Sequence, residues 1–144
     1  MSAKTIRDID VIRTFVLQGT LNFTRYFFKI RQKRKFVVGK HHREIAAALD
    51  KVLCGEITRL IINIAPRYGK TELAVKNFIA EGLAINPKAK FIHLSYSDDL
   101  ARDNSRGVQD IINEPEYRRI FPATIPTSTN TKKWYTTEGG GLYA

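Results

Sequence analysis

The chain has 144 residues, 43% of them hydrophobic, which is enough for one modest domain with a buried core and excludes a disordered composition. Its formal net charge of +10 at pH 7 indicates a polyanionic partner, with nucleic acid the natural candidate. The single cysteine, Cys54, excludes an internal disulfide and fits a reducing cytoplasm, and charged residues interrupt every apolar run of membrane-spanning length.

Two helices are predicted at the N-terminus, over residues 5–18 and 22–34, because apolar side chains recur there at helical spacing. The second helix opens the densest group of positive charges in the chain. This basic cluster, which no acid interrupts between its first and last members, consists of Arg25, Lys29, Arg31, Lys33, Arg34, Lys35, Lys40 and Arg43. It fits sequence-independent contact with DNA phosphates, and it equally fits a solvated basic face with interleaved aromatic rings turned inward.

A third helix is predicted over residues 44–53, ending near Gly55. The β-branched run from Leu60 to Ile64 then predicts a buried parallel strand, which Pro66 must end. A helix follows over residues 71–82, with its apolar positions on one face. The order is therefore strand, glycine-containing loop and helix.

The loop between that strand and helix carries Gly69, Lys70 and Thr71 in the order that a phosphate-binding loop requires. Backbone N–H groups and a lysine ammonium bind polyphosphate oxygens, and a hydroxyl holds Mg²⁺. The usual motif also has a glycine where this chain has Ile64. The alternative interpretation is an ordinary strand-to-helix turn with an exposed lysine.

Downstream, residues 90–95 are predicted as a second strand, and Ser97 caps a helix that runs to about residue 113. We interpret Asp98 and Asp99 as charges that favour the start of this helix rather than as catalytic groups. Residues 114–130 read as a loop-rich connector. Residues 133–137 and 142–144 are predicted to form a glycine-turned hairpin, with Trp134 in the core.

The segment Ala65-Pro66-Arg67-Tyr68-Gly69-Lys70-Thr71-Glu72 resembles the phosphate loop of large terminase subunits from tailed bacteriophages. Residues 91–101, Phe-Ile-His-Leu-Ser-Tyr-Ser-Asp-Asp-Leu-Ala, are similar to the next strand and helix of that family. The resemblance covers roughly residues 36–144. One departure is Ala65, where the family usually has a second proline.

This resemblance implies an α/β fold of the P-loop NTPase type, in the additional-strand class, with a mostly parallel sheet flanked by helices. We expect an incomplete version of it: an N-terminal helical basic appendage over residues 1–38 and a partial ATPase domain over residues 39–144. The family's acidic Mg²⁺-site strand and its nuclease domain would lie beyond residue 144. The isolated chain is accordingly expected to be inactive as an ATPase and poorly stable.

The resemblance also assigns roles to individual residues. Lys70 and Arg67 are the catalytic candidates, with Arg67 as a sensor of the γ-phosphate or, alternatively, a surface arginine without a catalytic role. Thr71 is the expected Mg²⁺ ligand. ATP with Mg²⁺ is the expected cofactor, and its predicted contacts are Pro66, Arg67, Tyr68, Gly69, Lys70, Thr71, Glu72 and His42. His42 could approach adenine, or be a partly buried structural histidine.

The implied function is ATP binding in a motor that drives double-stranded DNA into a procapsid. The implied partners are DNA, a portal protein, a small terminase subunit and, in a complete motor, further copies in a ring of five. The expected place of action is the host bacterial cytoplasm and, transiently, the portal, with no membrane partner. Two alternatives stay open: another P-loop nucleic-acid motor such as a helicase, and a non-enzymatic nucleotide- or DNA-binding remnant of a prophage gene.

Overall fold

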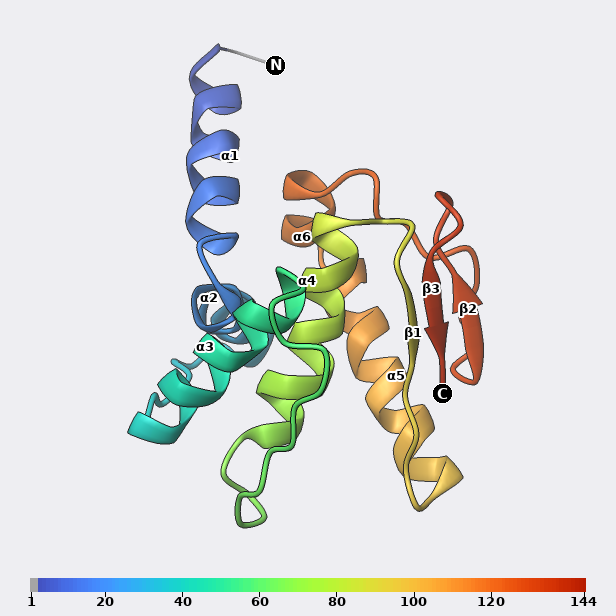
Figure 1. The fold of residues 1–144 in the computed structure, drawn as a ribbon. Coiled ribbons are helices and arrows are strands. Elements are labelled where there is room, and N and C mark those ends of the chain that lie inside the picture. Colours follow the sequence, from blue (N-terminus) through green and yellow to red (C-terminus); the bar gives the residue numbers. More distant parts are fainter. Residues whose placement is uncertain (1–2) are drawn as a thin grey trace.

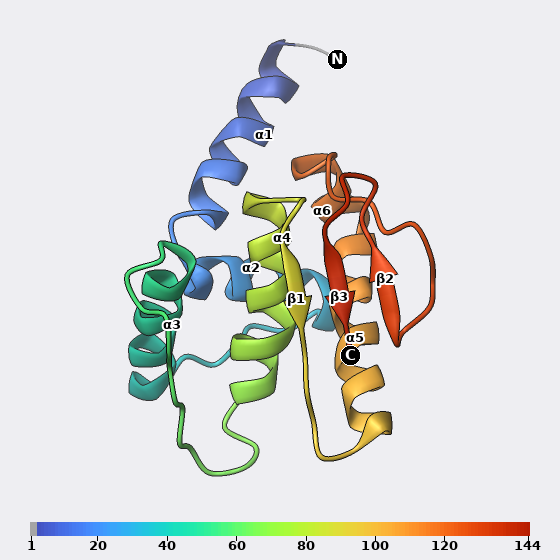
Figure 2. The ribbon, with the colours of Figure 1, turned by 45° about the vertical axis from the view of Figure 1, so that its right-hand side comes forward.

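The computed structural model describes residues 3–144, and helices make up 54% of the chain. In chain order the elements are α1 (Ala3–Val16), α2 (Thr20–Gln32), α3 (Lys40–Leu53), the π-helix η1 (Glu72–Asn77), α4 (Phe78–Ile85), β1 (Lys90–Ile92), α5 (Asp98–Asn113), α6 (Pro115–Ile120), β2 (Lys133–Tyr135) and β3 (Gly141–Tyr143). Helix α1 projects away from the rest, whereas α4 and α5 lie behind one face of a small sheet (Figures 1 and 2).

The predicted fold class is wrong. The described strands form one mixed sheet in the order β1-β3-β2, in which β1 pairs parallel with β3 and β2 pairs antiparallel with β3. This small sheet on a mostly helical body is not the mostly parallel, helix-flanked sheet of a P-loop NTPase. The predicted hairpin over β2 and β3 is confirmed, and Trp134 is buried as expected.

The predicted strand over residues 60–64 is also wrong, for a physical reason. A β-branched run becomes a buried strand only where a neighbouring strand accepts its backbone hydrogen bonds. None of the strands that the structure describes pairs with this run, and the Ile61 side chain is 85% exposed. Likewise β1 ends at Ile92, and Tyr96 beyond it is 95% exposed.

The predicted helices are confirmed with small shifts of their ends, because their signals are local. Helix α5 starts where Ser97, in an extended conformation, accepts a hydrogen bond from the Leu100 N–H at 3.5 Å. The helix predicted over 71–82 is η1 continued by α4. Helix α6, which begins at Pro115, was not predicted within the connector, although proline is favoured at the first position of a helix.

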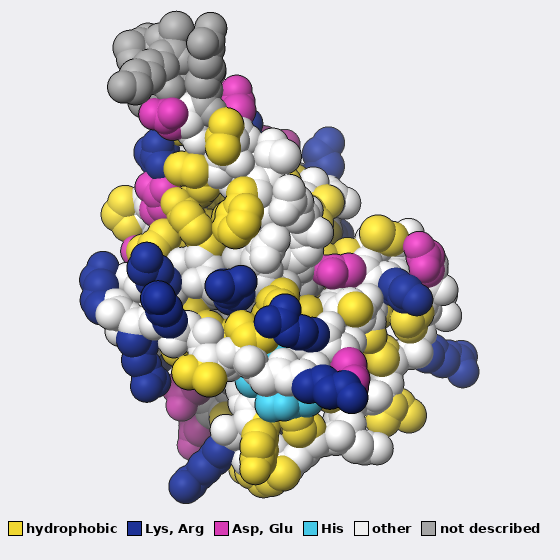
Figure 3. Space-filling model, turned by 90° about the vertical axis from the view of Figure 1, so that its left-hand side faces the viewer, with side chains coloured by type: hydrophobic (Ala, Val, Ile, Leu, Met, Phe, Trp, Pro, Cys, Tyr) yellow, Lys and Arg dark blue, Asp and Glu magenta, His cyan; other side chains and the backbone are white. Residues whose placement is uncertain are grey.

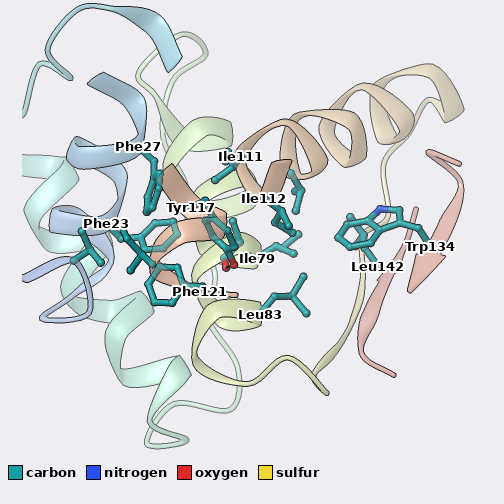
Figure 4. Packing of buried hydrophobic residues seen from close by; sticks show 14 residues of the cluster. Phe23, Phe27, Ile79, Leu83, Ile111, Ile112, Tyr117, Phe121, Trp134 and Leu142 are labelled. Atoms are coloured by element: carbon teal, nitrogen blue, oxygen red, sulfur yellow. Dashed lines mark hydrogen bonds between the residues drawn. The ribbon is translucent and has the colours of Figure 1, made fainter. Parts of the chain in front are cut away.

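The core joins the helical body to the sheet (Figure 4). On the helical side, the rings of Phe23 and Phe27 in α2 pack on each other and on Tyr117 of α6, whose hydroxyl donates to the Ala80 carbonyl at 2.8 Å. On the sheet side, Trp134 donates its indole N–H to a serine hydroxyl of α5 at 3.0 Å. Burial of apolar side chains, aromatic and aliphatic, is the main favourable contribution to the free energy of folding.

One carboxyl group is buried among the helices. Glu81 in α4 is 1% exposed, and its Oε2 atom has no hydrogen-bond partner. Burial raises the pKa of Glu81 from 4.5 to about 7; nearby Asp50 adds to the rise and the Thr20 side chain opposes it. The Thr20 hydroxyl donates its hydrogen bond to Asp50 at 2.8 Å, so it is not free to donate to a Glu81 carboxylate. The site therefore favours the protonated form of Glu81.

We therefore expect stability to fall as the pH rises. A carboxyl pKa raised from 4.5 to about 7 on folding means that the folded state holds the proton more tightly. The contribution of Glu81 to the free energy of unfolding is greatest below pH 4.5. It falls by about 3 kcal/mol in total as the pH rises from 4.5 to 7. In urea unfolding, Glu81→Gln should be more stable than the wild type at pH 8, and the difference should shrink toward pH 5.

The matched control is Glu138→Gln, which changes an exposed carboxyl group in the same way. It should leave the free energy of unfolding unchanged at both pH values. A Glu81→Gln protein that is no more stable than the wild type at pH 8 would contradict this account of the buried carboxyl.

Candidate nucleotide site

The loop of residues 66–70 contains two residues in the left-handed region. Gly69 has φ 77° and Arg67 has φ 68°. Glycine adopts this conformation freely, whereas for arginine it costs about 1 kcal/mol or more. Gly69 is needed for a second reason, since an added Cβ atom would lie 2.8 Å from Nε2 of His42. Both the backbone conformation and the packing against His42 therefore favour glycine at position 69.

His42 fixes the loop from α3. Its Nδ1 accepts the Gly39 backbone N–H at 2.9 Å, so the ring proton must sit on Nε2, which donates to the Tyr68 carbonyl at 2.8 Å. His41 places its own Nε2 3.1 Å from the same nitrogen and 3.3 Å from the same carbonyl oxygen. Burial lowers the pKa of His42, which keeps the ring neutral. Both nitrogens of His42 are thus engaged with the protein.

The helix that follows the loop begins with exposed cationic and hydroxyl side chains. Leu73 donates its N–H to the Gly69 carbonyl at 3.0 Å, so the N–H groups of Lys70, Thr71 and Glu72 belong to a first turn that has no acceptors within the helix. The Lys70 and Thr71 side chains are exposed at this end. N–H groups and a lysine in this arrangement favour an anion.

Glu72 faces the helical body instead of solvent. Its Oε1 accepts from Arg31 of α2 at 2.8 Å and from Asn77 at 3.0 Å, and the Arg31 and Glu72 side chains are only 10% and 17% exposed. Asn77 also donates to the Glu72 backbone carbonyl at 2.7 Å, five residues back, which spans the π-helical turn. Such turns are often found at functional sites.

A pocket of about 460 Å³ lies beside the loop, between residues 34–42 and 67–72. Its walls are rings: Phe36 packs edge-on against Phe28 and His42, with centroids 5.2 and 4.9 Å apart, and His41 packs against Tyr68 at 5.7 Å. Its cations are Arg34, Lys35 and Arg67. In the space-filling view, histidine side chains lie below a group of Lys and Arg (Figure 3). Rings and cations together suit a flat, anionic ligand.

The structure therefore divides the predicted site residues into two groups. The pocket brings together His42, Arg67, Tyr68, Gly69 and Glu72. Pro66, Lys70 and Thr71 do not line it; they are exposed along the loop and the start of the helix. Contact between His42 and adenine stays a prediction, and any such contact would use the ring face, because both ring nitrogens are engaged.

The other wall of the pocket was not predicted from the sequence. Phe28, Phe36 and His41 were not predicted as site residues, and Arg34 and Lys35 were interpreted either as DNA contacts or as part of a solvated basic face. The signal was present as aromatic residues interleaved with the basic cluster. Arg31, counted in that cluster, is instead buried in its ion pair with Glu72.

Comparison of the chain with known protein families, curated proteins and solved structures found no match. None of the helices described is both long and apolar enough to span a membrane. Among the side chains that the structure describes, no group of three or more His, Cys, Asp or Glu residues could hold a metal ion. The loop and the pocket beside it are therefore the features of this chain that bear on its function.

The role of His42 as an anchor predicts a pH dependence. A histidine pKa lowered on folding means that its contribution to stability is present above about pH 6.5 and is lost as the pH falls below that value. Protonated Nδ1 could no longer accept the Gly39 N–H. We expect His42→Ala to lower the free energy of unfolding at pH 7.5 by about 1–3 kcal/mol.

We expect His42→Gln, which cannot be protonated, to lose less stability than the wild type between pH 7.5 and pH 5.5 in urea unfolding. His93, whose pKa burial also lowers, supplies a pH-dependent loss common to both proteins, so their difference isolates His42. Identical pH dependence in the two proteins would show that His42 does not anchor the loop through its neutral ring.

Proposed function

We propose that the chain binds ATP with Mg²⁺ at this loop and pocket, as the nucleotide-binding part of a viral DNA-packaging motor. The observation that carries the proposal is the adjacency of the loop of residues 66–70 to a pocket with aromatic walls and three cationic side chains. A nucleotide has the matching parts: a flat base and a chain of phosphates. The resemblance of residues 65–72 to terminase loops adds the biological assignment.

In this proposal each residue has a separate task. Lys70 and the N–H groups at the start of the helix bind phosphate oxygens, and Arg67 approaches the γ-phosphate from within the loop. Thr71 supplies the hydroxyl that would hold Mg²⁺. Tyr68 and Gly69 shape the loop, held by His42, while Glu72 ties the helix to Arg31. ATP would supply the free energy that the motor uses.

The proposed setting is the host bacterial cytoplasm and, transiently, the procapsid portal. There the chain would work with a portal protein, a small terminase subunit, double-stranded DNA and, in a complete motor, a ring of five copies. The exposed members of the basic cluster support the DNA contact, since their side chains reach solvent over α2, α3 and the segment between them (Figure 3).

A second candidate function follows from the corrected fold. The small mixed sheet departs from the sheet of motor ATPases, which favours a non-enzymatic protein that binds nucleotide and DNA. The two candidates share the site and differ in turnover. ATP hydrolysis by the purified chain that Lys70→Ala abolishes would support the motor and contradict the second candidate.

Lys70 provides the sharpest test of binding. Calorimetric titration with ATP and Mg²⁺ should show binding by the wild type that Lys70→Ala weakens about 10- to 100-fold, since one charged hydrogen-bond partner is lost. The matched control is Lys51→Ala, which removes an exposed lysine of α3 and should bind like the wild type. Equal affinity of the wild type and Lys70→Ala would exclude the proposed phosphate contact.

Binding to duplex DNA tests the basic cluster separately. Reversing the charges of Lys33, Arg34 and Lys35 to Glu should weaken binding and reduce the slope of log affinity against log salt by up to about 3, because each phosphate contact releases counterions. The control makes the same change in net charge on the other side of the molecule, at three exposed lysines: Lys88, Lys90 and Lys132.

The control triple variant should keep most of the wild-type slope. Filter binding at several salt concentrations measures both values. If the two triple variants lose affinity equally, the contact is a general effect of net charge and not of the basic cluster.

A further inference from the structure

A second groove lies between α1 and α2, next to the candidate nucleotide site, with which it shares Lys35 and Phe36. It has a volume of about 240 Å³, and its lining residues are Phe15, Arg25, Tyr26, Lys29, Lys35 and Phe36. Phe15 is 46% exposed, and Val11, one helical turn before it, is 68% exposed. These two side chains form an apolar strip on the helix that projects from the body (Figures 1 and 2).

The rim of the groove is positive. Arg25 and Lys29 lie one turn apart on α2 with exposed side chains, and Lys35 joins them from the following segment. The floor offers no free hydroxyl, since Tyr26 donates to Glu116 at 2.6 Å. In Figure 3, hydrophobic side chains gather below the grey N-terminal residues, and Lys and Arg side chains lie below them. The surface thus combines an apolar wall with a cationic edge.

We propose that this groove docks an acidic amphipathic helix of a partner protein. Apolar residues four apart on a projecting helix give a second helix a continuous strip to pack against. Charge complementarity identifies the polar side of the partner, because Arg25, Lys29 and Lys35 would pair with Glu or Asp at its flank. Duplex DNA fits less well, since contact between phosphates and the apolar side chains of Val11 and Phe15 adds no favourable free energy.

The groove and the proposed DNA contact share their cations but not their apolar residues. Arg25, Lys29 and Lys35 belong to both, so a partner helix in the groove would compete with DNA at those three residues. Val11 and Phe15 belong neither to the basic cluster nor to the candidate nucleotide pocket. Substitutions at Val11 and Phe15 can therefore test partner docking without changing the positive charge of the proposed DNA contact.

The probe is a synthetic, fluorescently labelled helix of about five turns. It carries leucines on one face and glutamates on both flanks. Its binding to the full chain is measured by fluorescence anisotropy. We expect saturable binding that Val11→Asn with Phe15→Asn weakens at least about tenfold, and that Arg25→Glu with Lys29→Glu also weakens. Leu94→Asn, which changes an exposed apolar side chain outside the groove, should have no effect.

Three controls make the outcome decisive. A scrambled peptide of the same composition should bind at least about tenfold more weakly, and equal binding would overturn the proposal. Circular dichroism should show unchanged helix content in the variants, whose altered side chains are exposed. Binding of oligothymidine or of phosphatidylserine vesicles should not depend on Phe15. If either does, the groove binds unpaired bases or a lipid surface and the proposal is wrong. Absence of binding by the wild type would also overturn it.

Discussion

The loop of residues 66–70 keeps its shape because His42 uses both ring nitrogens on backbone groups. The ring joins Gly39, at the start of α3, to the Tyr68 carbonyl, and it leaves Gly69 no room for a side chain. The chain can make this arrangement only with a neutral imidazole, since Nδ1 must accept. The pocket beside the loop exists because the same ring brings residues 34–42 against residues 67–72.

Helix α2 supports the site from the other side. Its Arg31 holds Glu72 in a nearly buried ion pair, while Phe23 and Phe27 anchor the helix in the core next to α6. A buried pair of this kind adds little net stability, but it specifies which face of η1 turns inward. Packing from α2 and hydrogen bonds from α3 together position a loop whose Arg67 and Gly69 both have positive φ.

The sequence predicted what depends on neighbours in the chain. Ser97 predicts the start of a helix, and the apolar spacing of residues 5–18 and 44–53 predicts two more. The structure confirms these three predictions. The run of residues 60–64 was mispredicted because a strand depends on a partner elsewhere in the chain, which local pattern cannot supply. Ile61 is exposed for that reason.

The candidate site was predictable to a similar degree. The motif and the resemblance predicted His42 and the loop residues from Pro66 to Glu72, and the structure brings His42, Arg67, Tyr68, Gly69 and Glu72 to the pocket. The aromatic wall was not, because Phe28 and Phe36 reach the loop only through the tertiary packing of α2 and the segment after it. Arg31 looked like a DNA-binding residue, and only the structure reveals its partner, Glu72, which lies 41 positions away.

The central claim is that one ligand contacts both walls of the pocket. Hydrogen exchange of the full chain with and without ATP and Mg²⁺ tests it most directly, because each backbone amide reports its own protection. The account predicts slower exchange in two segments at once, residues 34–42 and residues 67–72. Protection confined to one of these segments, or to a different part of the molecule, would contradict it.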